Sequence, residues 1–211
     1  KTFVHDSWYA WFDNGRGDTI TASYVYHPCA SPGHTAQRIN TYYMVMNCRD
    51  GAWTNVQGEP LALPVTKETA DQQTLIQATG KEKSNHGSCH VDAEGRPHIF
   101  FRFPGQVRYY RWDGKAWSAA VAVAANYGKG VDGDFYLETP LSVTALLTQN
   151  NAGNGEVNRW QTVDGGVSWT KAATLFSAPG LSFQATALVR NAHPDARMLV
   201  SSSSAEQAHL Y

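Results

Sequence analysis

A short motif, an Asp-Gly turn followed by a tryptophan, recurs along the chain and constrains its fold more than any other feature. It occurs as Asp50-Gly-Ala-Trp53, Asp113-Gly-Lys-Ala-Trp117 and Asp164-Gly-Gly-Val-Ser-Trp169. Asp-Gly favours a tight turn because glycine adopts positive φ without steric cost, and the tryptophan supplies an aromatic packing anchor. The copies are separated by about the length of one four-stranded propeller blade with variable loops. The repeat therefore predicts a fold assembled from similar four-stranded units.

Each copy of this motif ends a series of short β-prone segments. In the first unit we expect strands at residues 7–12, 19–27, 39–46 and 52–54. The order recurs in the second unit, where residues 116–118 are the expected outer strand. The long connector, residues 61–80, is expected to hold a short helix capped at Thr66.

The predicted fold class is all-β, a β-propeller of four-stranded antiparallel blades. A propeller explains the pattern better than a sandwich, because each unit needs neighbours on both of its faces. We place the blades at residues 5–57, 84–122, 131–173 and 181–211, the last of them incomplete. About three and a half blades cannot close a ring of the usual 4–8. We therefore expect this chain to be part of a larger propeller whose preceding blades are its partners.

Charge and hydropathy exclude several classes of partner. The 211-residue chain has a net charge of −1 and 17% charged residues, so it carries no basic field for nucleic acid or for a membrane surface. No apolar run approaches the roughly 20 residues of a membrane-spanning helix. The first residues also lack the form of a signal peptide. We expect neither a nucleic-acid nor a membrane partner.

Cysteine and histidine residues gather in two segments, residues 27–34 and 85–90, that the predicted topology brings to one end of adjacent blades. Zn²⁺ prefers Cys and His ligands in tetrahedral array, so we predict a structural zinc site there. The preferred ligands are Cys29, His34, His86 and Cys89, with His27 and His90 as substitutes. A Cys29–Cys89 disulfide and free buried thiols remain the alternatives. Calcium is not expected at residues 131–134, because the remaining loop ligands are missing.

Cationic and aromatic side chains fall at the same predicted end. In an antiparallel meander the start of the first strand, the end of the second and the start of the third lie together. The candidates for contact with an anionic substrate are Arg38, Arg102, Arg108 and Tyr109. A solvated outer position also explains Arg108, and inter-blade packing also explains one of the two adjacent tyrosines.

Three segments carry a family resemblance: the connector at residues 58–66 (GEPLALPVT), the GRPH hairpin at residues 95–98 and the box at residues 164–169. Together they resemble the BNR-repeat propellers related to sialidases and, more narrowly, the propeller-type polysaccharide lyases that include the ulvan lyases. This resemblance implies a seven-bladed propeller that cleaves beside a uronic acid by β-elimination, using a His/Tyr/Arg set. It also implies that much of this set lies in preceding blades, so the catalytic residues stay unassigned.

The resemblance implies a secreted or periplasmic lyase with an anionic, ulvan-like sulfated polysaccharide as its substrate. Two alternatives stay open. A sialidase-like glycoside hydrolase would need an arginine triad with a Tyr/Glu pair, which the sequence does not assemble. A non-catalytic carbohydrate-binding propeller would stack sugars on tryptophans such as Trp8, Trp11 and Trp160.

Overall fold

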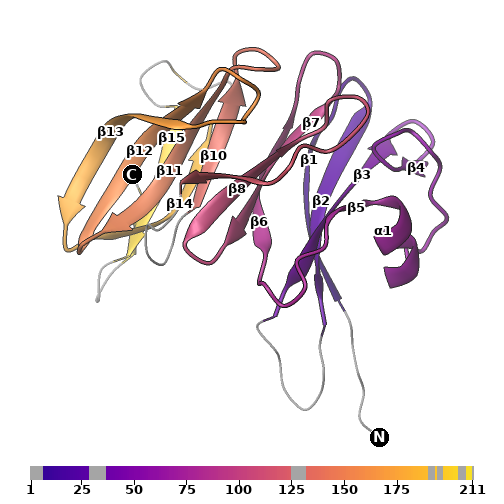
Figure 1. Cartoon of the computed structure of the whole chain (residues 1–211), viewed down its shortest axis with the longest axis horizontal. Helices are drawn as coiled ribbons and strands as arrows, with labels where there is room; N and C mark the ends of the chain where they lie inside the picture. The colour runs from indigo at the N-terminus through magenta and orange to yellow at the C-terminus, as the bar shows by residue number, and fades with distance from the viewer. Residues whose placement is uncertain are drawn as a thin grey trace, which may run out of the picture. The chain divides into compact units, whose positions relative to one another are not determined.

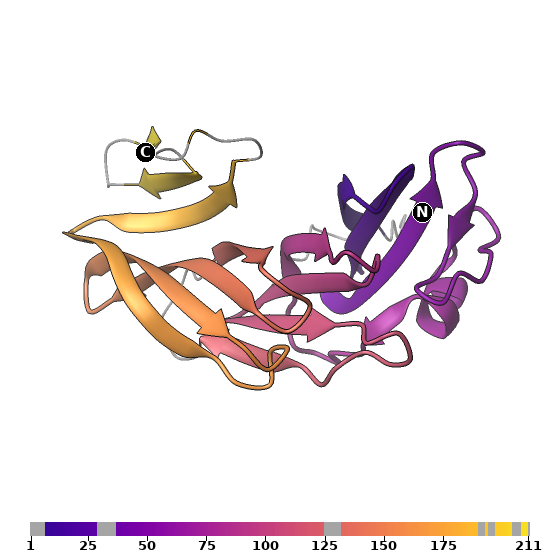
Figure 2. The ribbon, with the colours of Figure 1, turned by 90° about the horizontal axis from the view of Figure 1, so that it is seen from above.

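The computed structural model describes residues 7–28, 37–124, 132–189, 193, 197–203 and 208–210, with only the backbone described at residues 86, 184–186, 203 and 208–210. It consists of antiparallel β-sheets and, within these residues, one short helix (Figures 1 and 2). The chain divides into two compact units, residues 1–103 with 111–118 and residues 104–110 with 119–211. No helix in the described ranges has the length and apolarity needed to cross a bilayer.

The first sheet is a meander with one added strand. Its order is β1 (Ser7–Asn14), β2 (Thr19–His27), β3 (Ile39–Asn47) and β4 (Trp53–Thr54), and β5 (Leu75–Gln77) also pairs with β3. The helix α1 (Lys67–Gln73) precedes β5. The sequence predicted the four meander strands and the helix but not β5, whose three residues are too few to show a period.

The remaining sheets repeat the antiparallel order. The second contains β6 (Asn85–Val91), β7 (Pro97–Phe103), β8 (Gln106–Arg111) and β9 (Val121–Ala124). The third contains β10 (Asp132–Leu137), β11 (Val143–Asn151), β12 (Asn154–Thr162) and β13 (Thr170–Pro179). The fourth contains β14 (Ser182–Leu188), β15 (Met198–Ser203) and β16 (Ala208–Leu210). The all-β class and the four-stranded antiparallel sheets are thus confirmed.

The Asp-Gly-Trp motif forms a turn that is held by its own carboxylate. Asp113 Oδ1 accepts hydrogen bonds from the backbone N–H groups of Lys115 at 2.7 Å and Ala116 at 2.8 Å. These bonds lower the pKa of the Asp113 carboxyl. Trp117 then packs edge-on against Tyr43, with 5.7 Å between ring centroids. Trp117 joins the sheet only through an isolated bridge to Trp112, so the prediction of an outer strand at residues 116–118 was wrong. The outer strand is β9, which begins after the turn.

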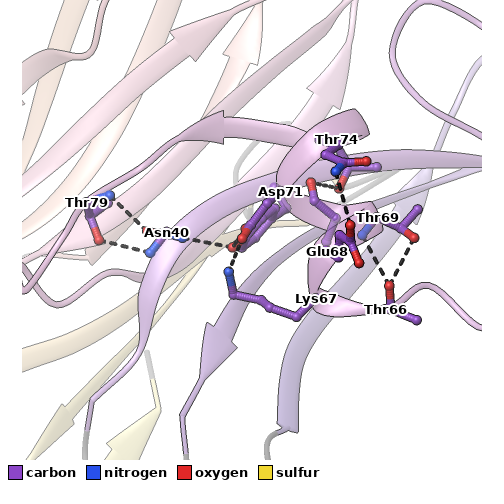
Figure 3. Close-up of polar contacts among 11 residues, drawn as sticks. Asn40, Thr66, Lys67, Glu68, Thr69, Asp71, Thr74 and Thr79 are labelled. Atoms are coloured by element: carbon purple, nitrogen blue, oxygen red, sulfur yellow. Dashed lines mark hydrogen bonds and ion pairs between the residues drawn. The ribbon is translucent and has the colours of Figure 1, made fainter.

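One face of the first sheet forms an aromatic core that α1 covers. Tyr24 and Tyr42 stack with 5.0 Å between ring centroids, and Trp8 meets both edge-on. The buried Ala70 of α1 packs in the same cluster. The helix begins where expected, because the side chain of Thr66 accepts a hydrogen bond from the backbone N–H of Thr69 (Figure 3).

Asn40 joins the start of β3 to the connector that follows the helix. Its backbone N–H donates to Thr79 Oγ1 at 2.9 Å, and its side-chain oxygen accepts from the Thr79 N–H at 3.0 Å (Figure 3). Its side-chain amide donates to the Tyr42 hydroxyl at 2.9 Å, and its carbonyl accepts from the Ser84 hydroxyl at 2.9 Å. These bonds hold Asn40 at φ 60°, a conformation that few residues other than glycine adopt.

The hairpin between β6 and β7 buries a histidine beside a carboxylate. Asp92 Oδ1 accepts hydrogen bonds from the N–H groups of Glu94 and Arg96, both at 2.9 Å, and thereby closes the turn. Asp92 Oδ2 lies 3.6 Å from Nε2 of His98, whose residue is 0% exposed. Burial lowers the pKa of His98 to about 4, although the nearby Asp92 opposes this shift.

Acid should therefore weaken the fold through His98. Because its folded pKa of about 4 lies below the ordinary 6.5, the unfolded chain binds more protons between these pH values, and stability falls as pH falls through this window. The full shift is worth roughly 3 kcal/mol. Urea unfolding of the protein and of His98→Gln between pH 8 and pH 4 measures this contribution.

The difference in unfolding free energy between the two proteins should shrink below pH 6.5 and stay constant above it. Parallel curves across the whole range would show that His98 does not titrate on unfolding.

Candidate functional site

Five strand ends meet at one end of the first unit. Ser7 at the start of β1 pairs with His27 at the end of β2. The carbonyl of Arg38, just before β3, accepts a hydrogen bond from the N–H of Ser84 at 2.7 Å. Asn85 at the start of β6 pairs with Arg102 near the end of β7. Side chains at these positions are thus gathered by the antiparallel meander, which is the end where the sequence predicted substrate contact.

Arg38 stands out because its guanidinium group has no counter-ion in the described part of the chain. Its Cζ lies over the Tyr9 ring, 4.1 Å from the ring centre, which is a cation–π contact. Its Nε is buried and has no hydrogen-bond partner. A buried guanidinium nitrogen without a hydrogen-bond partner is costly, and an external carboxylate or sulfate would supply a partner. Arg38 is therefore a candidate anion-binding group.

Tyr9 belongs to a row of side chains on one face of β1. Ser7, Tyr9 and Trp11 share this face because successive residues of a strand alternate. Tyr9 stacks with Trp11 at 6.3 Å between ring centroids and meets the His27 ring edge-on at 5.2 Å. The Ser7 hydroxyl and His27 Nδ1 are 3.2 Å apart, a hydrogen-bond distance that orients the buried imidazole. The arrangement joins a cation, a phenol, an imidazole and an aromatic surface.

Of the other predicted substrate contacts, Arg102 lies at the same end of the first unit, whereas Arg108 and Tyr109 belong to the second unit. Arg102 is half-buried in β7 of the first unit, and Arg108 is half-buried in β8 of the second unit. Tyr109 is 1% exposed and packs edge-on against Trp169 at 5.3 Å between ring centroids. The ring of Tyr109 thus packs in the core of the second unit, and its contact with a polymer stays a prediction.

The zinc site stays a prediction. Cys29 and His34 lie outside the described residues, and of His86 only the backbone is described. Cys89 is a buried free thiol that accepts a hydrogen bond from the Thr21 hydroxyl at 3.7 Å. Burial raises the pKa of this thiol to about 12, an effect that the hydrogen bond opposes. The described ranges contain no cluster of three or more His, Cys, Asp or Glu side chains suited to a metal ion.

Sequence reasoning missed Tyr9 and the contact between Tyr9 and Arg38. Of the tryptophans proposed for sugar stacking, Trp8 packs in the aromatic core on the other face of the first sheet. Trp160 is buried, and its indole N–H donates a hydrogen bond to Gln149 at 3.0 Å. Only Trp11 lies on the same face as Tyr9. The sequence signal that could have revealed Tyr9 is strand alternation. Residues 7, 9 and 11 fall on one face of β1, and residue 7 pairs with His27, so these side chains lie on the same face of the sheet.

Comparison with known proteins finds similar sequences among ulvan lyases. The chain is 38% identical over 212 residues to "Ulvan Lyase-PL25" of Pseudoalteromonas sp. (strain PLSV), covering 92% of this chain and 43% of the relative. It is 36% identical over 219 residues to "Ulvan lyase" of Alteromonas sp. (strain LOR), covering 96% of this chain and 45% of the relative. The chain thus spans less than half the length of these curated relatives.

A solved structure of a "PL25-Ulvanlyase bound to -[GlcA(1-4)Rha3S]-" superposes with a TM-score of 0.92 at 36% sequence identity, covering 98% of this chain and 51% of that chain. Residues 4–124, more than half of the chain, match the model of the family described as "BNR repeat-containing family member". The chain, with its repeated Asp-Gly-Trp turns and antiparallel sheets, belongs to the BNR repeat-containing family.

Proposed function

We propose that the protein is a polysaccharide lyase that cleaves an ulvan-like, sulfated, uronate-containing polysaccharide by β-elimination. The observation that carries the proposal is the Arg38 guanidinium, which is held on the Tyr9 ring without a counter-ion in the described part of the chain. The ulvan lyases of similar sequence support the reaction class and the substrate.

Elimination beside a uronate has three chemical requirements. The carboxylate must be neutralised so that the adjacent carbon becomes acidic, a base must remove the proton there, and an acid must protonate the departing oxygen. A guanidinium binds a carboxylate through two parallel hydrogen bonds. We assign the neutralising role to Arg38, whose buried Nε has no hydrogen-bond partner in the structure.

Tyr9 and His27 are the proton-transfer candidates nearest to Arg38. The Tyr9 ring lies directly beneath the guanidinium and carries a hydroxyl that both donates and accepts protons. His27 lies behind Tyr9, its ring 5.2 Å away and oriented by Ser7. We assign both proton transfers to Tyr9: its phenolate oxygen removes the proton from the sugar carbon and then returns that proton to the departing oxygen, while His27 supports the orientation of Tyr9. Trp11, stacked on Tyr9, extends the surface on which a sugar ring packs.

The sheets are proposed to be blades of a seven-bladed propeller, with the remaining blades supplied by the rest of the protein. The supporting fact is that this chain spans only 43–45% of the two curated relatives. Groups from those blades would complete the cleft over Arg38 and Tyr9. A secreted or periplasmic location is proposed as well, because a long polysaccharide is degraded outside the cytoplasm.

Incubation of the protein with ulvan tests the reaction class. β-Elimination leaves an unsaturated uronate, so ultraviolet absorbance should rise as the chains shorten. Shortening without that rise would identify a glycoside hydrolase. Saturable binding without shortening would identify a carbohydrate-binding module, for which Tyr9 and Trp11 would be the stacking surface.

Arg38→Gln should lower kcat/KM on ulvan by about 10²–10³-fold, because it removes the positive charge that stabilises the developing enolate. Arg38→Lys should recover only part of the loss, because an ammonium cannot form the two parallel bonds. Steady-state absorbance assays measure both variants.

The matched control is Arg49→Gln, which removes an exposed arginine paired with Asp18 at 2.6 Å. Equal losses in the Arg38 and Arg49 variants would argue against a specific role for Arg38.

Tyr9→Phe should lower kcat by about 10²–10⁴-fold with little change in KM. The phenylalanine ring keeps the contacts with Arg38 and Trp11, so only the proton-transferring hydroxyl is lost. Separate determination of kcat and KM on ulvan checks this expectation. A large rise in KM at unchanged kcat would instead show that Tyr9 serves binding alone.

A further inference from the structure

The second unit contains a pocket that the proposed cleavage site does not use. It has a volume of about 450 Å³ and lies between the β10–β13 sheet and the β14–β15 strands. Its apolar and aromatic walls include Tyr136, Leu146, Leu175 and Leu188, and two arginines, Arg159 and Arg197, also line it. Such a volume is within the range of small-ligand sites.

Strand register places Arg159 on the face of the sheet that lines this pocket. Arg159 of β12 pairs with Leu146 of β11, which in turn pairs with Asp134 of β10. These three side chains therefore share one face, while the neighbouring Asn158 and Trp160 point to the other. The β12–β13 pairing is irregular on both sides of Arg159, at Val157/Asn158 and at Arg159/Trp160. Bulges of this kind re-aim side chains next to binding sites.

Arg159 has no counter-ion in the described part of the chain. Its Nε is buried and lacks a hydrogen-bond partner. The nearest acid in the same row, Asp134, accepts hydrogen bonds from the N–H groups of Leu188 and Phe135 at 2.9 and 2.8 Å. Two strand spacings, about 10 Å, separate Asp134 from Arg159. The guanidinium thus opens into an apolar pocket without a partner of its own.

We propose that this pocket binds a sulfated 6-deoxyhexose residue of the polysaccharide, at a subsite separate from the proposed cleavage site. The sulfate ester accepts hydrogen bonds from the Arg159 guanidinium, and the methyl group and apolar ring face pack against Leu146 and Leu175. The identity of the sugar rests on the proposed function and on the -[GlcA(1-4)Rha3S]- ligand of the similar solved structure. Glucuronate fits less well, because it has no methyl group for the leucine wall.

Calorimetric titration of the protein with rhamnose 3-sulfate tests the proposal, with rhamnose, glucuronate and inorganic sulfate as comparison ligands. The protein should bind rhamnose 3-sulfate saturably and more tightly than each comparison ligand. Arg159→Gln should weaken this binding at least tenfold. Leu175→Trp should also weaken the binding of rhamnose 3-sulfate. Leu175 lines the pocket and is 48% exposed, so an indole ring at this position would fill the pocket.

Lys171→Gln is the matched control. It removes one positive charge from the same sheet, at a residue paired with Glu156 at 3.2 Å and outside the pocket lining. This variant should keep the affinity of the unaltered protein. Thermal unfolding of all variants verifies that they are folded.

Three results would overturn the proposal: no saturable binding, binding that Arg159→Gln leaves unchanged, or glucuronate binding as tightly as rhamnose 3-sulfate. The test is independent of cleavage. Arg159-dependent binding by a protein that does not cleave ulvan would support the pocket and refute the lyase. Cleavage without such binding would support the lyase and refute the pocket.

Discussion

The capture of backbone N–H groups by an aspartate carboxylate is the interaction on which the repeated units depend. In the turn at Asp113 two such bonds set the chain direction, and Trp117 is thereby delivered to its packing position against Tyr43. Asp164 accepts hydrogen bonds from the backbone N–H of Ser168 at 3.0 Å and from the Ser168 hydroxyl at 2.6 Å, and Trp169 packs against Tyr109. At both turns the aspartate fixes one aromatic anchor, and the anchor packs on a tyrosine of the preceding sheet.

Much of this architecture could be predicted because it is determined by sequence patterns a few residues long. Asp-Gly pairs, β-prone runs and the Thr66 cap act over a few residues, and the structure has the meander strands and the helix that they imply. The features that could not be predicted are non-local. Strand β5 exists because β3 offers an edge, and Tyr109 is buried because Trp169, sixty residues away in the same unit, covers its ring. The Arg38–Tyr9 contact likewise joins strand β1 to the residue just before β3, and β2, which pairs with both strands, lies between them in sequence.

Arginines on this protein fall into two physical classes. Arg49 is exposed and paired with Asp18, so the pair contributes little to stability. Arg38 and Arg159 have buried Nε atoms and no counter-ion in the described residues. The fold sustains that electrostatic cost at Arg38 on an aromatic ring and at Arg159 among leucines, and Arg111 also has a buried Nε without a hydrogen-bond partner. The surroundings of the two arginines differ, because Arg38 lies on an aromatic ring and Arg159 lies among leucines. A flat aromatic surface suits the face of a sugar, and an aliphatic wall suits a methyl substituent.

The hydrogen bonds of Asn40 couple the position of Arg38 to the connector between the first two sheets. Arg38 is only two residues before Asn40, whose left-handed backbone is held by Thr79 and Ser84 from the far end of the connector. The end of the connector therefore holds the backbone next to Arg38 in place. Shortening or lengthening the connector would displace the backbone beside Arg38 without changing the Tyr9 ring on which its guanidinium lies.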